Sequence, residues 1–279
     1  MAKIKVAAPA KINLTLEVLD KREDGFHNIK SIMQAISLYD YLTITVSDND
    51  FTKIILNGNS SEIPYDEKNL VYKACICFLN ETNIQNKKIE VYIEKNIPVE
   101  AGLAGGSTDA AATLFALNSL FNHVLNDSQI EKLCASLGSD LNFCLYGGTA
   151  VCSGRGENIQ KIKTIIQPVT LIKPLGFGIS AKEAYTKFGQ MFDKSVPNNT
   201  EKLAKCFDKA LLYNSLEKAV IDDYSELQEI KNKVKHSMMS GSGPTFFVLS
   251  ANCPEEFDNS LFQIIENLSF VEDGVKIVN

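Results

Sequence analysis

The chain has 279 residues, of which 45% are hydrophobic and 22% are charged, and its formal net charge is −6. This length and apolar content suit a protein with a large buried core, while the acidic balance without any Lys/Arg-rich block argues against nucleic acid as a partner. The sequence has no run of 18 apolar residues and no signal segment at its start, so we expect a cytoplasmic protein with no membrane partner.

Strand and helix patterns follow one another in mixed order along the chain. In chain order they predict a strand at Leu42–Val46, a helix at Asn69–Leu79, a strand at Ile89–Ile93, helices at Ala110–Leu120 and from Ser128 to about Gly138, a turn into a strand at Gly147–Val151, a strand at Pro168–Lys173, a helix at Ser225–Lys235, a strand at Thr245–Leu249 and a helix at Glu255–Leu268. Two helix starts carry specific signals, a capping box at Ser128–Glu131 and Ser225 as an N-cap. Because strands and helices do not alternate regularly, we predict an α+β fold with one domain at residues 1–160 and a second at 161–279.

The segment Pro98–Asp109 has the composition of an anion-binding loop. It follows a predicted strand and precedes a predicted helix, and three of the five positions from 102 to 106 are glycine. Glycines let the backbone approach a ligand closely, and a helix start offers unpaired N–H groups and the positive end of a dipole. Ser107 and Thr108 either cap the helix or turn a hydroxyl toward a phosphate or metal ion. Alone, the segment is equally consistent with a plain capped turn, and it matches neither a Walker A loop, a dinucleotide-binding fingerprint nor the protein-kinase signatures.

Three other segments offer the remaining groups that phosphoryl transfer needs. Lys11 and Asn13 alternate along a strand pattern, so both side chains lie on one face among apolar neighbours. Asp140 lies in an otherwise apolar stretch, where it is either a helix-terminal aspartate or a carboxylate that receives a proton. Met239–Thr245 is a second glycine turn, either a simple strand entry or a loop that closes over phosphates.

These segments, together with four others, occur in an order that resembles the GHMP kinase superfamily. The four others are Lys21–His27, Leu38–Asp40, Gly147–Ala150 and Gly154–Glu157. The resemblance is dense over residues 6–157 and returns at Ile179–Tyr185 and Met239–Thr245. It is strongest to the branch of the superfamily that acts on a cytidine-diphosphate-bearing alcohol in the non-mevalonate route to isoprenoid precursors.

The resemblance implies a fold and a reaction. The N-terminal domain would be similar to domain 2 of ribosomal protein S5, the C-terminal domain would be ferredoxin-like, and the site would lie in the cleft between them. ATP, with Mg²⁺, would donate its γ-phosphate to the 2-hydroxyl of the methylerythritol part of a small-molecule cytidine-diphosphate substrate. We expect the protein to be a monomer or a weak homodimer.

The resemblance also implies roles for residues of the catalytic and nucleotide sites. Asp140 would be the general base, Lys11 would keep it ionised and stabilise the developing charge, and Asn13 would lie beside them at the acceptor. The resemblance assigns no metal ligand, and Ser107 is a candidate for one. The residues implied for ATP are Asn69, near the adenine, and Gly102, Leu103, Ala104, Gly105, Gly106, Ser107 and Thr108, around the triphosphate.

At the substrate end, the resemblance implies that His27 hydrogen-bonds cytosine while Phe26 and Tyr185 stack on its faces. The sequence departs from the family pattern in two places: Phe26 stands where tyrosine is usual, and Leu141–Asn142 stands where Val-Pro is often found. Glu100 puts a carboxylate beside the polyphosphate loop, so we expect it to point to solvent.

Three other interpretations remain open, one of which is a plain structural domain, although three phosphate-compatible loops in family order would then be a coincidence. Mevalonate, phosphomevalonate and homoserine kinases belong to the same superfamily, although they lack the combined patterns at Asp24–His27 and Gly154–Glu157. A nucleotide-binding regulatory protein without turnover would share the fold, but the presence of both Lys11 and Asp140 argues against it.

Overall fold

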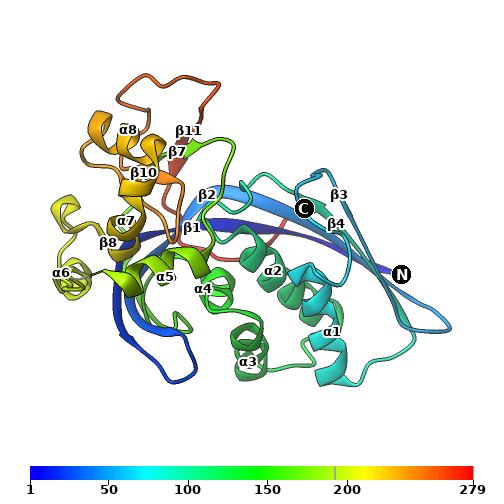
Figure 1. Ribbon diagram of the computed structural model, residues 1–279. Coiled ribbons are helices and arrows are strands. Elements are labelled where there is room, and N and C mark those ends of the chain that lie inside the picture. The colour runs from blue at the N-terminus through cyan, green and yellow to red at the C-terminus, as the bar shows by residue number, and fades with distance from the viewer. Residues whose placement is uncertain (192, 279) are drawn as a thin grey trace.

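The fold is organised around two long antiparallel strands, β1 (Ala2–Lys21) and β2 (His27–Asp48), which pair over most of their length. The computed structural model describes residues 1–191 and 193–278. In these residues, β1 and β2 belong to an eight-stranded sheet whose main path runs β12-β1-β2-β4-β3, with β5 beside β2, β6 beside β5, and β8 beside β1 (Figure 1). The other strands of this sheet are β3 (Lys53–Gly58), β4 (Lys87–Glu94), β5 (Thr149–Gly154), β6 (Asn158–Ile162), β8 (Tyr213–Asn214) and β12 (Lys276–Val278).

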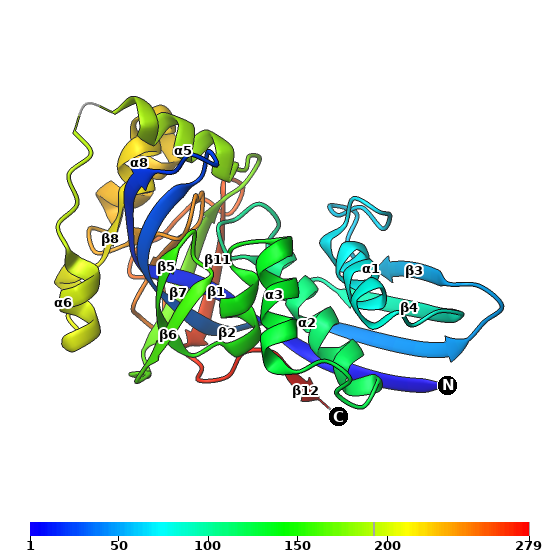
Figure 2. The same ribbon diagram turned by 90° about the horizontal axis from the view of Figure 1, so that it is seen from below.

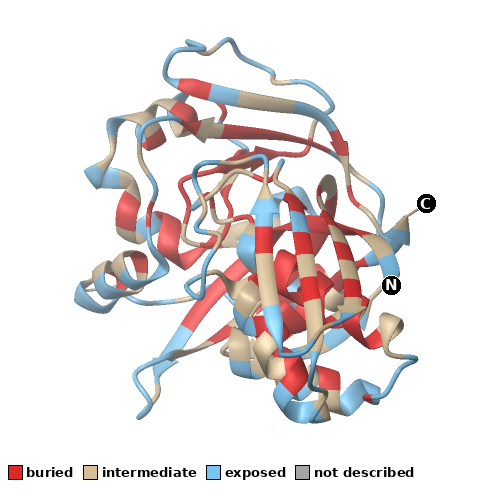
Figure 3. Cartoon of the chain, turned by 90° about the vertical axis from the view of Figure 1, so that its right-hand side faces the viewer, coloured by how far each residue is buried: buried red, intermediate tan, exposed pale blue. Residues whose placement is uncertain are grey.

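Helices α1 (Leu70–Thr82), α2 (Gly105–Leu120), α3 (Asp127–Leu137) and α4 (Leu141–Tyr146) lie together on one side of this sheet (Figure 2). Along the strands that face the viewer in Figure 3, buried residues alternate with partly and fully exposed ones, as expected for a sheet covered on one face. The buried residues of β2 and β4 pack against α1 and α2 in one core cluster. Small alanines at positions 110–112 of α2 are fully buried there, which lets the helix lie close to its neighbours.

A four-stranded sheet follows, in the order β11-β7-β10-β9 with antiparallel neighbours throughout. Its strands are β7 (Pro168–Pro174), β9 (Met238–Met239), β10 (Phe246–Val248) and β11 (Phe262–Ser269). The connection from β7 to β9 contains α5 (Ala181–Gln190), α6 (Asn199–Lys205), α7 (Ser215–Val220), α8 (Ser225–Lys233) and the 3₁₀ turns Lys209–Leu211 and Ile221–Asp223. Numbered along the chain, these strands stand in the order 4-1-3-2, as in a ferredoxin-like sheet, and the expected α+β fold is confirmed.

The helix predicted at Glu255–Leu268 is wrong, because strand β11 occupies the second half of that segment. Phe257, Leu261, Ile264 and Leu268 have helical spacing, which explains the error. In the fold, however, β11 pairs with β7 over most of its length. Pairing with a distant strand has therefore overridden a local preference.

The other predicted strands and helices are found near their expected positions, but two helix caps differ. The capping box of α3 joins Asn126 to Gln129, so Ser128 lies inside the helix. The N-cap of α8 is Tyr224 with no side-chain bond, and Ser225 is the first helical residue. The domain boundary at residue 160 stays a prediction, and we note that β12, at the end of the chain, lies in the first sheet.

Candidate active site

A cleft of about 1100 Å³ opens between the tip of the β1–β2 hairpin, the glycine segment before α2, the start of α4, and α5. Figure 2 shows α5 beside this hairpin. Of the residues implied for the site, those that line the cleft are Lys11, Asn13, Phe26, His27, Gly102, Ala104, Ser107, Asp140 and Tyr185. Asn69, Leu103, Gly105, Gly106 and Thr108 are not among its lining residues.

Lys11 and Asp140 face each other in the cleft, with Lys11 Nζ 3.6 Å from Asp140 Oδ2. The two residues come from β1 and from the turn before α4, 129 positions apart in the chain. Asp140 holds the N-cap position of α4 but makes no side-chain capping bond, so helix capping does not account for its carboxylate. The Lys11 side chain is 5% exposed and that of Asp140 is 29% exposed, so a mostly buried ammonium lies beside a carboxylate that a ligand can reach.

The start of α2 presents a helix N-terminus to the cleft. The helix begins at Gly105, earlier than predicted, and its N-cap residue Ala104 has a φ of 59° and makes no side-chain capping bond. The N–H groups of the first turn have no intrahelical acceptor, which suits them to bind an anion. Ser107 and Thr108 lie inside the helix and do not cap it, and the Thr108 hydroxyl is buried without a partner in the described part of the chain.

The second glycine turn packs directly on the first. Ser240 Oγ donates a hydrogen bond of 3.0 Å to the carbonyl of Gly102, and Gly241 and Ser242 also line the cleft. A β-carbon on Gly102 would lie 2.1 Å from the Ser240 carbonyl oxygen, so the two backbones touch where a side chain has no room. The backbone N–H of Lys11 in turn donates to the Leu103 carbonyl at 3.1 Å, which ties β1 to the glycine segment.

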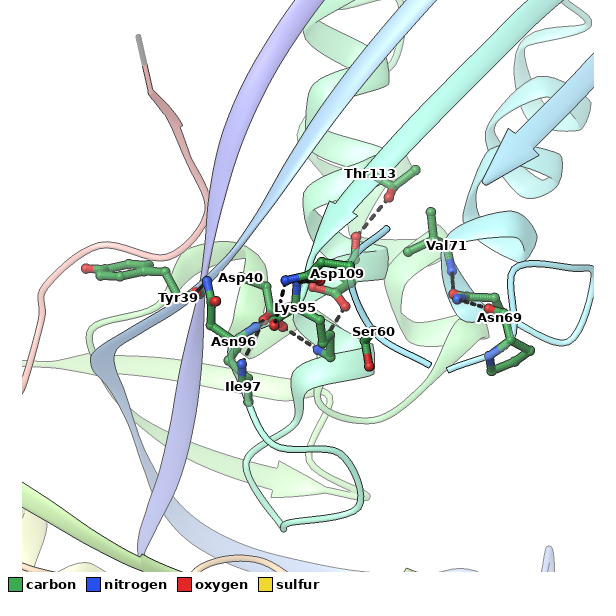
Figure 4. A network of polar contacts seen from close by, with 12 residues as sticks. Tyr39, Asp40, Ser60, Asn69, Val71, Lys95, Asn96, Ile97, Asp109 and Thr113 are labelled. Carbon is green, nitrogen blue, oxygen red and sulfur yellow. Dashed lines mark hydrogen bonds and ion pairs between the residues drawn. The ribbon is translucent and has the colours of Figure 1, made fainter. Parts of the chain in front are cut away.

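Behind the glycine segment lies a buried ionic cluster that sequence reasoning missed (Figure 4). Lys95 Nζ pairs with Asp40 and, at 3.0 Å, with Asp109 Oδ2, and all three side chains are at most 5% exposed. The ammonium also lies 2.6 Å from the place that a β-carbon on Gly105 would take, directly behind the first residue of α2. The only sequence signal for this cluster was Asp40, which belongs to the family-like segment Leu38–Asp40.

Burial and the neighbouring charges both shift the pKa values of Asp109 and Lys95. Burial raises the pKa of Asp109 to about 8, against the lowering effect of Lys95. Burial also lowers the pKa of Lys95, but the attraction of Asp109 and Asp40 outweighs it, and the pKa of Lys95 is raised. The cluster therefore places the Lys95 ammonium between two acidic side chains in the interior, directly behind the start of α2.

Replacing Lys95 by methionine should lower the free energy of unfolding by about 3–5 kcal/mol, because a fully buried Asp40 loses its cation. Chemical denaturation at pH 7 measures this directly. Lys87→Met is the matched control: Lys87 begins β4, the strand that Lys95 directly follows, and its partner Asp48 is 91% exposed, so no measurable change is expected. Equal effects of the two substitutions would show that the cluster does not stabilise the fold.

Neither Asn69 nor Glu100 lines the cleft. Asn69 caps α1, accepting from the Val71 N–H at 2.9 Å and donating to the Pro64 carbonyl at 2.7 Å (Figure 4). Its expected place near the adenine stays a prediction. Glu100 is exposed and does not line the cleft, so the expectation that it points to solvent is confirmed.

The opposite end of the cleft is aromatic. The rings of His27 and Tyr185 stack with their centroids 5.2 Å apart, and Phe188 meets His27 edge-on at 6.3 Å. Phe26 is 51% exposed, and the guanidinium of Arg155 lies 5.0 Å from the centre of its ring. Sequence reasoning gave Arg155 no role, although it quoted the Gly154–Glu157 motif.

Charge around His27 is positive. Lys21, Lys182 and Lys194 line this part of the cleft, together with one acid, Asp20. Burial, followed by the charges of Lys21 and Lys194, lowers the pKa of His27 below its usual value. At neutral pH, His27 is therefore a neutral imidazole with one donor and one acceptor nitrogen.

The fold agrees with comparisons to known proteins. A sequence profile described as "GHMP kinases N terminal domain" matches residues 69–148, which include α1, the glycine segment and Asp140. A solved homoserine kinase from Cytophaga hutchinsonii covers 100% of this chain and 98% of its own with a TM-score of 0.78, but at 19% identity it shows only a shared fold. The architecture is that of a GHMP kinase.

Relatives with higher sequence identity show to which family of GHMP kinases the chain belongs. Proteins named 4-diphosphocytidyl-2-C-methyl-D-erythritol kinase are 40% identical over 256 residues in Clostridium tetani, with 88% of this chain and 90% of the relative covered, and 42% identical over 258 residues in Bacillus mycoides, with 88% of each covered. A crystal structure of 4-(cytidine 5'-diphospho)-2C-methyl-D-erythritol kinase matches with a TM-score of 0.72 and 29% identity, over 88% of this chain and 90% of that chain. The chain belongs to the 4-diphosphocytidyl-2-C-methyl-D-erythritol kinase family.

Within residues 1–191 and 193–278, no group of three or more His, Cys, Asp or Glu side chains is placed to hold a metal ion. None of the helices in the same ranges combines the length and apolar character needed to span a bilayer.

Proposed function

We propose that this chain transfers the γ-phosphoryl group of ATP to the 2-hydroxyl of 4-diphosphocytidyl-2-C-methyl-D-erythritol. The observation that carries the proposal is the Lys11–Asp140 pair, which stands in one cleft between the N-terminus of α2 and the His27–Tyr185 stack. A phosphate donor, a proton acceptor and an aromatic binding region are the three parts that a kinase for a nucleotide-linked alcohol requires. The family membership of the chain supports the same substrate.

In this proposal, Asp140 receives the proton of the acceptor hydroxyl as the hydroxyl oxygen attacks the γ-phosphorus, and the bond from that phosphorus to the β,γ-bridging oxygen breaks to release ADP. Lys11, whose ammonium is held 3.6 Å from the carboxylate, stabilises the negative charge that develops on the transferring group. The first-turn N–H groups of α2 bind the triphosphate oxygens, and the turn at Gly241–Ser242 closes the site from the opposite side.

Mg²⁺ fits this arrangement as a companion of ATP. It commonly takes one or two protein oxygens, with phosphate oxygens and waters completing its shell, so a preformed protein cage is not required. The hydroxyl of Ser107 lies on α2 at the edge of the cleft and is the residue that would hold it. When bound, the ion would neutralise charge on the triphosphate.

At the cytidine end, a neutral His27 offers a donor and an acceptor to the edge of the base, and Tyr185 and Phe26 offer ring faces. Lys21, Lys182 and Lys194 stand close enough to this end to bind the diphosphate of the substrate. A cytoplasmic location and a monomeric or weakly dimeric state stay predictions.

The direct test is a coupled assay of ADP release with ATP, Mg²⁺ and a panel of alcohols. We expect turnover with 4-diphosphocytidyl-2-C-methyl-D-erythritol and at least a hundredfold lower kcat/KM with mevalonate, phosphomevalonate or homoserine, because those acceptors leave the aromatic end without a partner. Preferred turnover of one of the other alcohols would refute the cytidine assignment. ATP binding without turnover of any alcohol would instead favour a regulatory protein.

A further inference from the structure

A chain of three hydrogen bonds runs from the interior of the protein to the Lys11 ammonium. Lys11 Nζ donates to Asn13 Oδ1 at 2.6 Å, Asn13 Nδ2 donates to Ser31 Oγ at 2.8 Å, and Ser31 Oγ donates to the Thr15 carbonyl at 2.5 Å. Lys11 and Asn13 belong to β1, and Ser31 belongs to the neighbouring strand β2. All four residues are at most 4% exposed, so water does not substitute readily for any of these partners.

The direction of these bonds follows from the number of protons available. A serine hydroxyl has one proton, and that of Ser31 is used on the Thr15 carbonyl, so its oxygen can only accept from Asn13. Asn13 must therefore turn its NH₂ group toward Ser31 and its carbonyl oxygen toward Lys11. In the flipped orientation, NH₂ would face the Lys11 ammonium, and two donors would meet.

We infer that Ser31 is a positioning residue for phosphoryl transfer. It acts through Asn13, by holding the amide in the one orientation that accepts from Lys11, and so fixes the ammonium beside Asp140. Ser31 is absent from the residues that line the cleft, and it needs no contact with substrate for this role. The inference rests on the proposed function, since Lys11 and Asp140 act on the reacting groups there.

The expected signature is a selective loss of kcat. Ser31→Ala removes the acceptor that fixes Asn13, so kcat should fall about three- to tenfold, the range expected for one lost hydrogen bond. KM for ATP should change less than twofold, because the start of α2 is not touched. Ser31→Thr keeps the hydroxyl and should recover most of the lost kcat.

The decisive experiment is a double-mutant cycle between Ser31→Ala and Asn13→Ala, measured with ATP and 4-diphosphocytidyl-2-C-methyl-D-erythritol. If Ser31 acts through Asn13, adding Ser31→Ala to Asn13→Ala should cost no further kcat. Ser237→Ala is the matched control, because Ser237 is also a buried serine that donates to a backbone carbonyl, and it lies outside the cleft. We expect it to leave kcat unchanged.

The outcomes separate the inference from the proposed function. A wild-type chain that does not turn over the substrate would overturn both. An active wild type in which Ser31→Ala keeps full kcat, or loses the same factor with and without Asn13, would overturn the inference alone. If Ser31→Ala fails to give a cooperative thermal transition, Ser31→Cys, which is close to serine in size but a weaker partner, is measured in its place.

Discussion

Replacing Asp140 by asparagine is expected to lower kcat by about 10²–10⁴-fold, the range in which a general base contributes. Asparagine keeps the shape of the side chain but cannot take up the hydroxyl proton. Affinity for ATP should change by no more than about threefold, because in the described residues the Asp140 side chain makes no capping bond and no hydrogen bond to the glycine segment. Single-turnover kinetics and titration of ATP by calorimetry measure the two effects separately.

A matched control removes the effect of net charge. Asp50→Asn makes the same chemical change at an exposed position between β2 and β3, outside the cleft, and should leave kcat and ATP affinity as they are. If Asp140→Asn instead abolished ATP binding, Asp140 would have a structural or metal-linked role. If kcat stayed within tenfold of wild type, another group would be the base.

Local pattern was sufficient for most elements of the fold because their burial is periodic in sequence. Leu42–Val46 and Ile89–Ile93 are confirmed as parts of β2 and β4, which pair with each other in the large sheet. The strand β11 could not be predicted in this way, because its helical spacing is opposed only by pairing with β7, about 90 residues earlier in the chain. Pairing between strands so far apart in the chain leaves no signal in a short stretch of sequence.

The residues of the candidate site, like the elements of the fold, could be predicted only where the signal is local in sequence. Lys11, Asp140 and the glycine segment were found because each is unusual in its own neighbourhood, and the fold brings them into one cleft. Lys95 and Ser31 were missed because the residues that they contact are distant in the sequence. Asp40 is 55 residues from Lys95, and Ser31 is 18 residues from Asn13. A lysine that follows a strand is usually solvated, and only three-dimensional contact shows that Lys95 is enclosed by two acidic side chains.

Contact between the two glycine turns has a consequence for the whole site. The Gly102 carbonyl accepts from Ser240, and residues of both turns line the cleft with Lys11. Lys11 itself is tied to the adjacent Leu103 carbonyl. Displacing one turn from the other should therefore move the backbone proposed to bind phosphate and the Lys11 ammonium together.

Gly102→Ala tests this coupling, and we expect it to destabilise the protein and to lower kcat/KM for ATP at least a hundredfold. The φ of Gly102 is 74°, which costs an alanine about 1–2 kcal/mol. The new β-carbon would also meet the Ser240 carbonyl oxygen at 2.1 Å and the Gly243 nitrogen at 3.0 Å, both backbone atoms, so the turns must separate at a cost of about 1–3 kcal/mol more.

Gly176→Ala isolates the effect of the clash. Gly176 has a φ of 85° and nothing within 4 Å of an added β-carbon, and it does not line the cleft, so this variant carries the backbone strain alone. Denaturation should place Gly102→Ala well below Gly176→Ala in stability, and only Gly102→Ala should lose activity at a temperature where both are folded. Equal stability and equal kcat/KM in the two variants would mean that the glycine turns are free to move apart, and that their contact does not position the ATP site.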